Sequence, residues 1–432
     1  MAWGAASVGS MRQGVVGLFL LFGALYFIQG VNETGTGLVY QPVNSLLKQW
    51  RHGDSDITTF MALLSVPWCL KPLFGLLSDF VPLAGMRRKS YLLATGVVTS
   101  VCYLGLSRLS LAHDSRWLLL AVLMLPTMAV TFGDVVLDAL IIEAGQLFGL
   151  TARLQSVRWG ASSLAAILTG SVAGLLTERD MHTTAFLACG LLAVAALILS
   201  ATFVREPPPT VIHEDFTTVK LTLREALHSR KFLMVGAFLF AWHINPCTSP
   251  LIYLHMTKTL RFSEQFYGFS NTLLSCGSAA ACAVYSFYCH RLSMRAMVPG
   301  AIACGIVSTL AYFLVINEAS ASAISVLVGF TYMTANLIQC DLAARVCPVH
   351  AAGTIFAIFM ALCNIGTDLS MWIGGHFYEL VKGYQGPGAA FEATMLVGAT
   401  LTLGSWSVAR LIPREGDDAK RVTGPEPVPE HD

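Results

Sequence analysis

The chain has 432 residues, of which 55% are hydrophobic and only 12% are charged, whereas soluble globular proteins carry about a quarter charged residues. This composition excludes an ordinary soluble enzyme, and the balance of 27 basic against 26 acidic residues provides no basic face for nucleic acid. Because a helix of about 20 apolar residues crosses a bilayer, the hydrophobic residues suffice for about twelve crossings. We therefore predict an all-α protein embedded in a lipid bilayer.

Apolar runs between charged residues predict twelve transmembrane helices. The first run follows an N-terminus that contains a single Arg, and no small-residue cleavage motif follows the run, so we expect a membrane helix rather than a removed signal peptide. The predicted spans, in chain order, cover residues 14–47, 57–78, 90–110, 116–145, 153–177, 184–203, 231–256, 264–289, 296–316, 321–346, 350–380 and 388–411.

One polar segment divides these spans into six plus six. It begins with the run EPPP at 206–209, which cannot continue a helix. Thr222 and Glu225 have the spacing of a capping box, which predicts a short surface helix. The chain after Pro413 has no apolar face to bury. We predict an N-terminal six-helix bundle over 1–204, a cytoplasmic linker over 205–230, a C-terminal six-helix bundle over 231–412 and a disordered cytoplasmic tail over 413–432, the two bundles being related by pseudo-symmetry.

The charges of the predicted loops give the orientation. An even number of spans places both termini on one side. That side would hold seventeen Lys and Arg residues, against eight in the loops of the other side. Because loops rich in Lys and Arg remain on the cytoplasmic side of a membrane, we expect both termini to be cytoplasmic. We expect a multi-pass protein of the plasma or inner cell membrane.

Two aspartates lie well inside the fourth predicted span. Asp134 and Asp138 are four residues apart and so share one helix face. Each costs about 2.5 to 3.5 kcal/mol at a bilayer centre, which makes both functional candidates. Lys71 and Arg158 lie at comparable depth and are the expected counter-ions. Two interpretations stay open: a static ionic lock, or ion pairs that change partners during transport.

Other polar residues of the predicted spans are candidates for a binding site. His243 is one candidate, although it could instead be a neutral histidine that bonds to a neighbouring helix. Pro246 is expected to kink the helix that contains His243. Asp341 and Arg345 are four residues apart and are expected to neutralise each other. The remaining candidates near the middle of their spans are Gln29, Glu33, Asn245, Asn364 and Asp368.

The segment GLLSDFVPLAGMRRKS at 75–90 resembles the loop between helices two and three of the major facilitator superfamily. The resemblance implies that Asp79, Arg87 and Arg88 form a cytoplasmic gate, and charge-assisted bonds of this kind can hold in one conformation only. Glu143 is expected to pair with one of these arginines. The second copy of the motif, YCHRLSMR at 288–295, lacks an acidic residue.

Signatures of catalytic or metal sites are missing from the sequence. The eleven cysteines are scattered, without Cys-x-x-Cys or Cys/His spacing for zinc, and are expected to be small apolar filler. No Gly-x-Ser-x-Gly or His-Glu-x-x-His string occurs. We expect neither an enzyme nor a bound metal or cofactor.

Five longer motifs narrow the family. They are YFIQGV (26–31), PWCLKPLFGLLSD (67–79), DVVLDALIIE (134–143), LQSVRWG (154–160) and LAARVCPVHAAGTIFA (342–357). Together they resemble the folate-biopterin transporter family of the major facilitator superfamily over nearly all twelve spans. The resemblance places Lys71, Asp134, Asp138, Arg158 and Arg345 in the family's charged motifs. Glu33 and Asp341 do not match them.

The resemblance implies a monomeric secondary transporter for folate, biopterin or related pteridines, with protons as co-substrate. Asp134 and Asp138 would carry the proton, and Lys71 and Arg158 would bind the substrate anion. An aromatic side chain would stack on the pterin ring, with Trp159, Phe132 and Trp242 as candidates. Two alternatives remain: a transporter of another solute, such as a muropeptide, an amino acid or a drug, and a non-transporting assembly or pigment-delivery factor.

Overall fold

The chain is helical throughout its described part. The computed structural model describes residues 8–81, 83, 85–86, 88–109, 115–148, 151–204, 228–288, 294–347 and 352–412. Within these ranges the only β-structure is one isolated bridge between Leu83 and Met86. Residues 205–227 of the predicted linker and the predicted tail over 413–432 lie outside the described residues, so both segments stay predictions.

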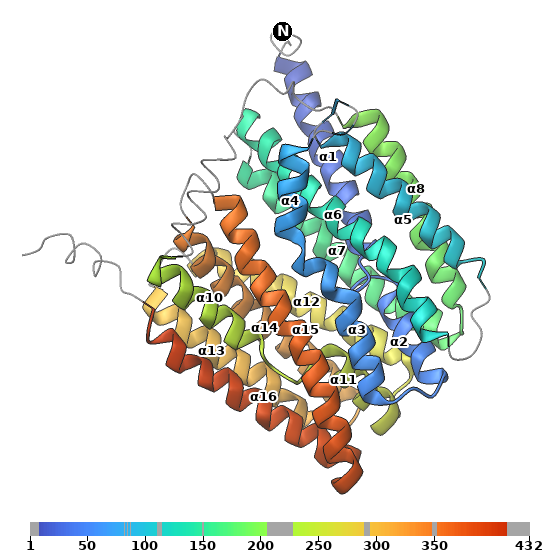
Figure 1. Ribbon diagram of the computed structural model, residues 1–432, viewed down its shortest axis with the longest axis vertical. Coiled ribbons are helices and arrows are strands. Elements are labelled where there is room, and N and C mark those ends of the chain that lie inside the picture. Colours follow the sequence, from blue (N-terminus) through green and yellow to red (C-terminus); the bar gives the residue numbers. More distant parts are fainter. Residues whose placement is uncertain are drawn as a thin grey trace, which may run out of the picture.

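The first half of the chain, which we term the N-terminal half, runs up and down through the molecule (Figure 1). Helix α1 packs against α7 and α8, and α5 packs against α6 and α8. The described helices of this half are α1 (Val8–Asn32), α2 (Tyr40–Gln49), α3 (Asp54–Cys69), α4 (Lys71–Phe80), α5 (Lys89–Leu106), α6 (Arg116–Phe148), α7 (Thr151–Glu178) and α8 (His182–Phe203).

The second half, termed the C-terminal half, has a similar content of long helices. Helix α13 packs against α14 and α16, and α10 packs against α15 and α16. The described elements are α10 (Arg230–His243), α11 (Ser249–Leu254), the π-helical turn η1 (His255–Thr259), α12 (Glu264–Tyr288), α13 (Met294–Leu310), the 3-10 turn η2 (Ala311–Leu314), α14 (Glu318–Val346), α15 (Ala352–Gln385) and α16 (Pro387–Ala409).

Nine helical segments of the described residues are long and apolar enough to cross a membrane. Of the other three predicted spans, 231–256 is broken between α10 and α11, while α12 and α16 are continuous helices of 25 and 23 residues that are not among these nine segments. The all-helical, membrane-spanning class is confirmed, and twelve crossings are consistent with it.

The first predicted span, 14–47, is two helices rather than one. The chain leaves α1 after Asn32 and enters α2 at Tyr40. In the intervening turn the Leu38 N–H donates to the Val31 carbonyl oxygen at 2.9 Å. A Cβ atom at Gly37 would lie 2.4 Å from that same oxygen, so only glycine permits this close return of the chain. The break places Glu33 outside regular helix.

The second predicted span is also broken, between α3 and α4. The Leu70 N–H donates to the carbonyl oxygen of Pro67 at 3.0 Å, which tightens the end of α3. Pro72 occupies the first turn of α4, where its missing N–H costs nothing. Lys71 thereby becomes the first residue of a helix, where the helix dipole disfavours a positive charge unless an anion is near.

The hydrophobic cores reveal how the two halves meet. One cluster contains only N-terminal-half residues, including Phe22, Tyr91 and Ile141. A second contains only C-terminal-half residues, including Phe232 and Phe359. Both lie toward the face at which α1 begins, which we call the N-terminal face. The third and largest cluster joins both halves toward the opposite end, the far face.

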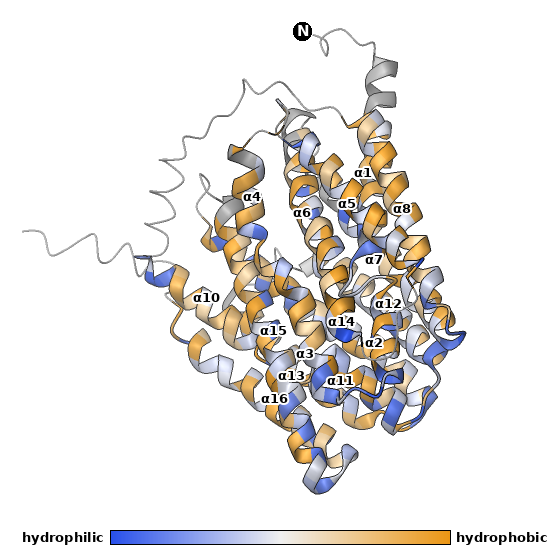
Figure 2. Cartoon of the chain, turned by 45° about the vertical axis from the view of Figure 1, so that its right-hand side comes forward, coloured by the Kyte–Doolittle hydropathy of each residue, from blue (hydrophilic) through white to orange (hydrophobic). Residues whose placement is uncertain are grey.

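Of the three clusters found among the described residues, the far-face cluster is the one that both halves share. Its members come from both halves and include Val39, Ile57, Leu123, Tyr253 and Phe391. Hydrophobic residues cover the length of the helices, and hydrophilic residues gather at the far face and at scattered interior positions (Figure 2). Within the described residues the molecule is therefore joined at one end and has separate cores at the other.

Glycines allow the halves to touch backbone to backbone between α7 and α12. A Cβ atom at Gly268 would lie 2.4 Å from the carbonyl oxygen of Gly170 and 2.6 Å from the Cα atom of Gly174. Small residues of this kind let membrane helices approach closely. On the other side of the molecule α3 packs against α15.

Candidate functional site

Two ion pairs form the centre of the candidate site. Lys71 Nζ lies 2.7 Å from Asp134 Oδ2, and Arg158 Nη2 lies 2.9 Å from Asp138 Oδ2. The aspartates are one turn apart on α6, and the two cations come from α4 and α7. This is the pairing expected from the sequence. Asp134 also supplies the negative charge that the N-terminus of α4 requires beside Lys71.

Aromatic rings support both ion pairs. Lys71 Nζ lies 4.3 Å from the ring centroid of Trp68, and the Arg158 guanidinium lies 5.3 Å from that of Tyr26. The Tyr26 hydroxyl donates to Asp138 Oδ1 at 2.6 Å. Cations are attracted to aromatic faces, and the effect grows as water is removed. We call Tyr26, Lys71, Asp134, Asp138 and Arg158 the charge cluster.

The cluster is partly accessible. The side chains of Arg158 and Asp138 are 22% and 28% exposed although they lie inside the helices that cross the membrane. The first pair is more enclosed, with Lys71 at 19% and Asp134 at 10%. Because ionised groups avoid lipid, we expect this exposed surface to face water rather than lipid.

The three aromatic stacking candidates differ in their surroundings. Phe132 is already stacked on Phe74, with ring centroids 4.8 Å apart. Trp242 is buried in the core of the C-terminal half. Trp159 is 47% exposed and lies beside Arg158, whose guanidinium is 5.5 Å from its ring centroid. Trp159 is therefore the candidate that still offers a free ring face.

Two candidates of the C-terminal half meet the N-terminal half next to the cluster. The Asn364 Nδ2 group donates to the carbonyl oxygen of Trp68 at 3.0 Å. Asp368 accepts hydrogen bonds from the Ser65 hydroxyl and, at 3.3 Å, from the Cys69 thiol. Both contacts fall on the last turns of α3, directly before Lys71. The structure thus brings Asn364 and Asp368 to the helix break that positions Lys71.

His243 and Asn245 instead organise the break between α10 and α11. His243 Nδ1 lies 2.8 Å from the carbonyl oxygen of Leu239, one turn back in its own helix. The Asn245 amide donates to the Thr309 hydroxyl at 2.8 Å, and its Oδ1 accepts from the Cys247 N–H at 3.0 Å. These contacts hold the helix ends to the C-terminal half, and they do not join the charge cluster.

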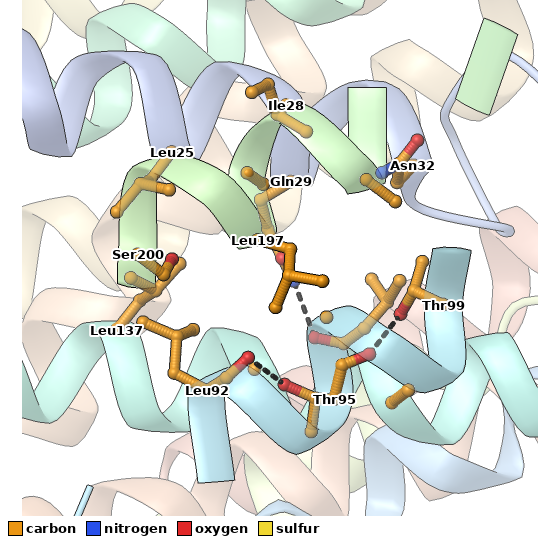
Figure 3. Close-up of a pocket in the computed structure, with 16 residues that line it drawn as sticks. Leu25, Ile28, Gln29, Asn32, Leu92, Thr95, Thr99, Leu137, Leu197 and Ser200 are labelled. Atoms are coloured by element: carbon orange, nitrogen blue, oxygen red, sulfur yellow. Dashed lines mark hydrogen bonds between the residues drawn. The ribbon is translucent and has the colours of Figure 1, made fainter. Parts of the chain in front are cut away.

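Gln29 lies in a small cavity inside the N-terminal half (Figure 3). Its Nε2 group donates to the carbonyl oxygen of Val130 at 2.6 Å. The cavity, of about 40 Å³, is lined by α1, α5, α6 and α8, and includes the polar residues Asn32, Thr95 and Ser200. A cavity of this kind needs about 10 to 15 Å³ to hold a water molecule, so this one has room for water.

The remaining predicted residues have varied outcomes. Asp341 and Arg345 pair at 3.1 Å, as expected, and the Tyr285 hydroxyl also contacts Asp341. Among the proposed gate residues, Arg87 and the side chains of Asp79 and Glu143 lie outside the described residues. Arg88 is buried at the residue before α5. The gate remains a prediction.

A second set of charges, which was not recognised from the sequence, joins the halves at the far face. Asp54 binds Lys258 Nζ at 2.6 Å and also pairs with Lys382, both from the C-terminal half. Lys48 pairs with Glu264, and Ser55 bonds with Glu379. We call these contacts the far-face pairs. Charges at predicted span ends were visible in the sequence, but their partners lie more than 200 residues away.

No group of three metal-ligating side chains occurs among the described residues. The candidate site can thus offer charges, hydrogen bonds and aromatic faces to a solute. It presents no nucleophile beside a base within the charge cluster.

Comparison with known proteins identifies the family. The model of the BT1 family matches residues 34–423 of this chain. The chain belongs to the BT1 family. A relative of this BT1-family chain is a folate-biopterin transporter from Synechocystis sp., with 27% identity over 81% of this chain and 72% of that protein. Another, a probable folate-biopterin transporter 4 from Arabidopsis thaliana, has 24% identity over 83% and 87% of the two chains. The family resemblance stated from the motifs is confirmed.

Solved structures confirm the fold of this BT1-family chain. The nucleoside transporter NupG superposes with a TM-score of 0.72 at 12% identity, covering 91% of this chain and 99% of its own. A D-xylose-proton symporter superposes with a TM-score of 0.70 at 14% identity, covering 93% and 99%. The fold is that of the major facilitator transporters. Family and fold together make the protein a multi-pass membrane transporter and not an enzyme.

Proposed function

We propose that the protein moves folate, biopterin or a related pteridine by alternating access, coupled to protons. The observation that carries this proposal is the charge cluster, in which two cations and two carboxylates face each other beside accessible aromatic rings. The names of its relatives, folate-biopterin transporters, support the choice of substrate class.

The chemistry of the cluster suits a folate. A pterin ring is flat and has hydrogen-bond donors and acceptors along its edges. Asp138 can hydrogen-bond to an edge, and Trp159 can stack on the face of the ring. The glutamate tail of folate carries carboxylates, which compete with Asp134 and Asp138 for Lys71 and Arg158. Substrate binding would therefore exchange the ion pairs rather than add to them, and a ligand that exchanges partners in this way shifts the conformational equilibrium.

The arrangement of the cores supports alternating access. The halves share a core and ion pairs at the far face and have separate cores at the N-terminal face. We propose that bundles 1–204 and 231–412 rock as units about the contacts between α7 and α12 and between α3 and α15. We infer that the protein lies in the plasma or inner membrane with both termini in the cytoplasm. The conformation with a joined far face and separate cores at the N-terminal face is then the inward-facing one. The transporter would act as a monomer.

The test is uptake by purified protein in liposomes. Labelled folic acid should accumulate, with competition by unlabelled biopterin, and an inward proton gradient should stimulate the rate. Arg158→Ala should lower uptake at least about tenfold, because the anion loses a charge-assisted bond. Arg410→Ala is the matched control, since Arg410 lies at the end of α16, outside the site.

Other outcomes separate the alternatives. Uptake of a muropeptide or an amino acid, without competition by folate, would replace the substrate class while keeping the transporter. Liposomes that move no solute, together with stoichiometric copurification of a partner complex, would favour a pigment-delivery or assembly role. A thermal-shift screen with pterins, folates and unrelated anions gives the first answer, because a bound ligand raises the apparent stability.

A further inference from the structure

Glu33 is a carboxylate at the break between α1 and α2. It is partly exposed, and Thr36 of the same turn lies near its carboxyl group. It also interacts electrostatically with Asp134 and Lys71 of the charge cluster. Within the described residues no cation lies within ion-pair distance of it.

The charges around this group do not balance. Glu33, Asp134 and Asp138 are three acids, whereas Lys71 and Arg158 are the two bases in electrostatic range of them. Full ionisation leaves one excess negative charge inside the membrane, where charges are poorly screened and costly. Asp134 and Asp138 each have a cation within 3 Å. Glu33 is the acid without a cation within ion-pair distance, so we expect an added proton to bind to its carboxylate.

Among the described residues, the helices packed around Glu33 offer no further cation. From α5, Tyr103 lies in electrostatic range, and its hydroxyl donates to the Asn32 carbonyl oxygen at 2.9 Å. From α6 comes Asp134, and from α4 comes Lys71. Helix α7 presents Ala165 to the adjacent Gly30.

Glu33 lies on the far-face side of the ion pairs. Along the antiparallel helices α1 and α6, Tyr26 bonds with Asp138, Gln29 with Val130, and Thr34 with Thr127 at 3.0 Å. Glu33 follows this register and stands between the charge cluster and the far-face pairs.

We propose that Glu33 binds the coupling proton, an inference that rests on the proposed transport of an anion. The sequence-based assignment of the proton to Asp134 and Asp138 is thereby replaced. A proton from solvent on Glu33 makes these five groups neutral in sum, so that one substrate carboxylate on Lys71 or Arg158 restores a single excess negative charge instead of raising the excess to two. Proton and anion then bind cooperatively, and each raises the affinity for the other. The proton returns to solvent after the substrate leaves.

The first test compares Glu33→Gln with the wild type in liposomes held at zero membrane potential. One coupled proton and a gradient of one pH unit support up to about tenfold accumulation of labelled folate. The variant should show no accumulation, while folate-for-folate exchange, which needs no net proton movement, continues. Glu318→Gln, on the first turn of α14, is the control and should accumulate folate normally. Gradient-driven accumulation by Glu33→Gln would overturn the proposal.

The second test needs no substrate. An infrared titration of the purified wild type should show the stretching band of a protonated carboxyl group that is lost in Glu33→Gln and kept in Glu318→Gln. If this band is lost but the wild type moves no folate, the proposed substrate fails and the proton site stands. If Glu33→Gln does not fold, Glu33→Asp replaces it and should shift the midpoint of the titration; an unchanged midpoint would reject the proposal.

Discussion

Lys71 and Asp134 show what a membrane protein must do to hold a charge between helices. Each is largely enclosed, and each has the other as its ionic partner at 2.7 Å. Removing one partner of a buried pair leaves an uncompensated charge and costs about 3 to 5 kcal/mol, whereas removing both is often neutral. The pair can therefore be tested for stability and for transport separately.

Lys71→Met is expected to destabilise the protein by about 3 kcal/mol, and the double variant Lys71→Met/Asp134→Leu should recover most of that loss. Transport should stay absent in both variants, because the substrate anion has lost its cation. Thermal unfolding in detergent and liposome uptake are the two measurements. A double variant that is stable and transports normally would reduce the pair to a static lock.

Among individual residues, the charged members of the site could be predicted from the sequence, and their hydroxyl partners could not. Asp134, Asp138, Lys71 and Arg158 stand out because charges are rare in apolar spans. Tyr26 and Ser65 do not, since a tyrosine is not unusual in an apolar span and a serine hydroxyl can bond to its own helix backbone, as Ser65 also does. The role of Asn245 in holding a helix break also left no signal in the sequence beyond the neighbouring Pro246.

Among the helices, α7 and α12 bring the backbones of the two halves into contact. Their approach depends on the absence of a side chain at Gly170, where a Cβ atom would lie 2.7 Å from the backbone nitrogen of Thr272. Because the obstructing atom belongs to the backbone of the other helix, a methyl group can fit only if the helices separate.

Gly170→Ala should destabilise the protein by about 1 to 3 kcal/mol and slow transport. Gly160→Ala is the matched control on the same helix, because nothing lies within 4 Å of its Cβ position. That variant should be neutral or slightly more stable, since alanine favours helix by about 1 kcal/mol over glycine. Equal melting temperatures for the two variants would contradict the packing argument.

The helices themselves were predictable within several residues, but their breaks were less so. Hydropathy marks a span without showing where its hydrogen bonding is interrupted, and the run 14–47 therefore appeared continuous. The irregular turn from Glu33 to Val39 depends on Gly37 meeting carbonyl groups of α1, a contact made only after folding. Pro246 was a visible breaker, and the break between α10 and α11 lies there.

The whole molecule is closed at the far face and divided at the N-terminal face. The composition of the chain was enough to predict a helical membrane protein, because few other classes carry so few charges. The state of the transporter was not predictable, since it depends on pairs such as Asp54 with Lys258, 204 residues apart. The boundaries of the two bundles stay predictions.

Locking the far face should stop the cycle. Ser55 and Glu379 are in hydrogen-bond contact across the halves, so Ser55→Cys with Glu379→Cys places two thiols within reach of a short bifunctional reagent. The cross-linked protein should still bind ligand in a thermal-shift assay but lose uptake, and a cleavable reagent should restore it. Each single-cysteine variant controls for the eleven native cysteines. Normal uptake after complete cross-linking would disprove the rocking motion.

The lysines that close the far face remain in contact with the surrounding medium. Lys258 and Lys382 are 33% and 39% exposed while they hold Asp54. The lysine ends of these pairs reach the medium, so dissolved salt weakens them, although Asp54 itself is only 2% exposed. We therefore expect the salt concentration on that side of the membrane to shift the conformational equilibrium. High salt would favour opening of the far face, and low salt would favour the closed far face.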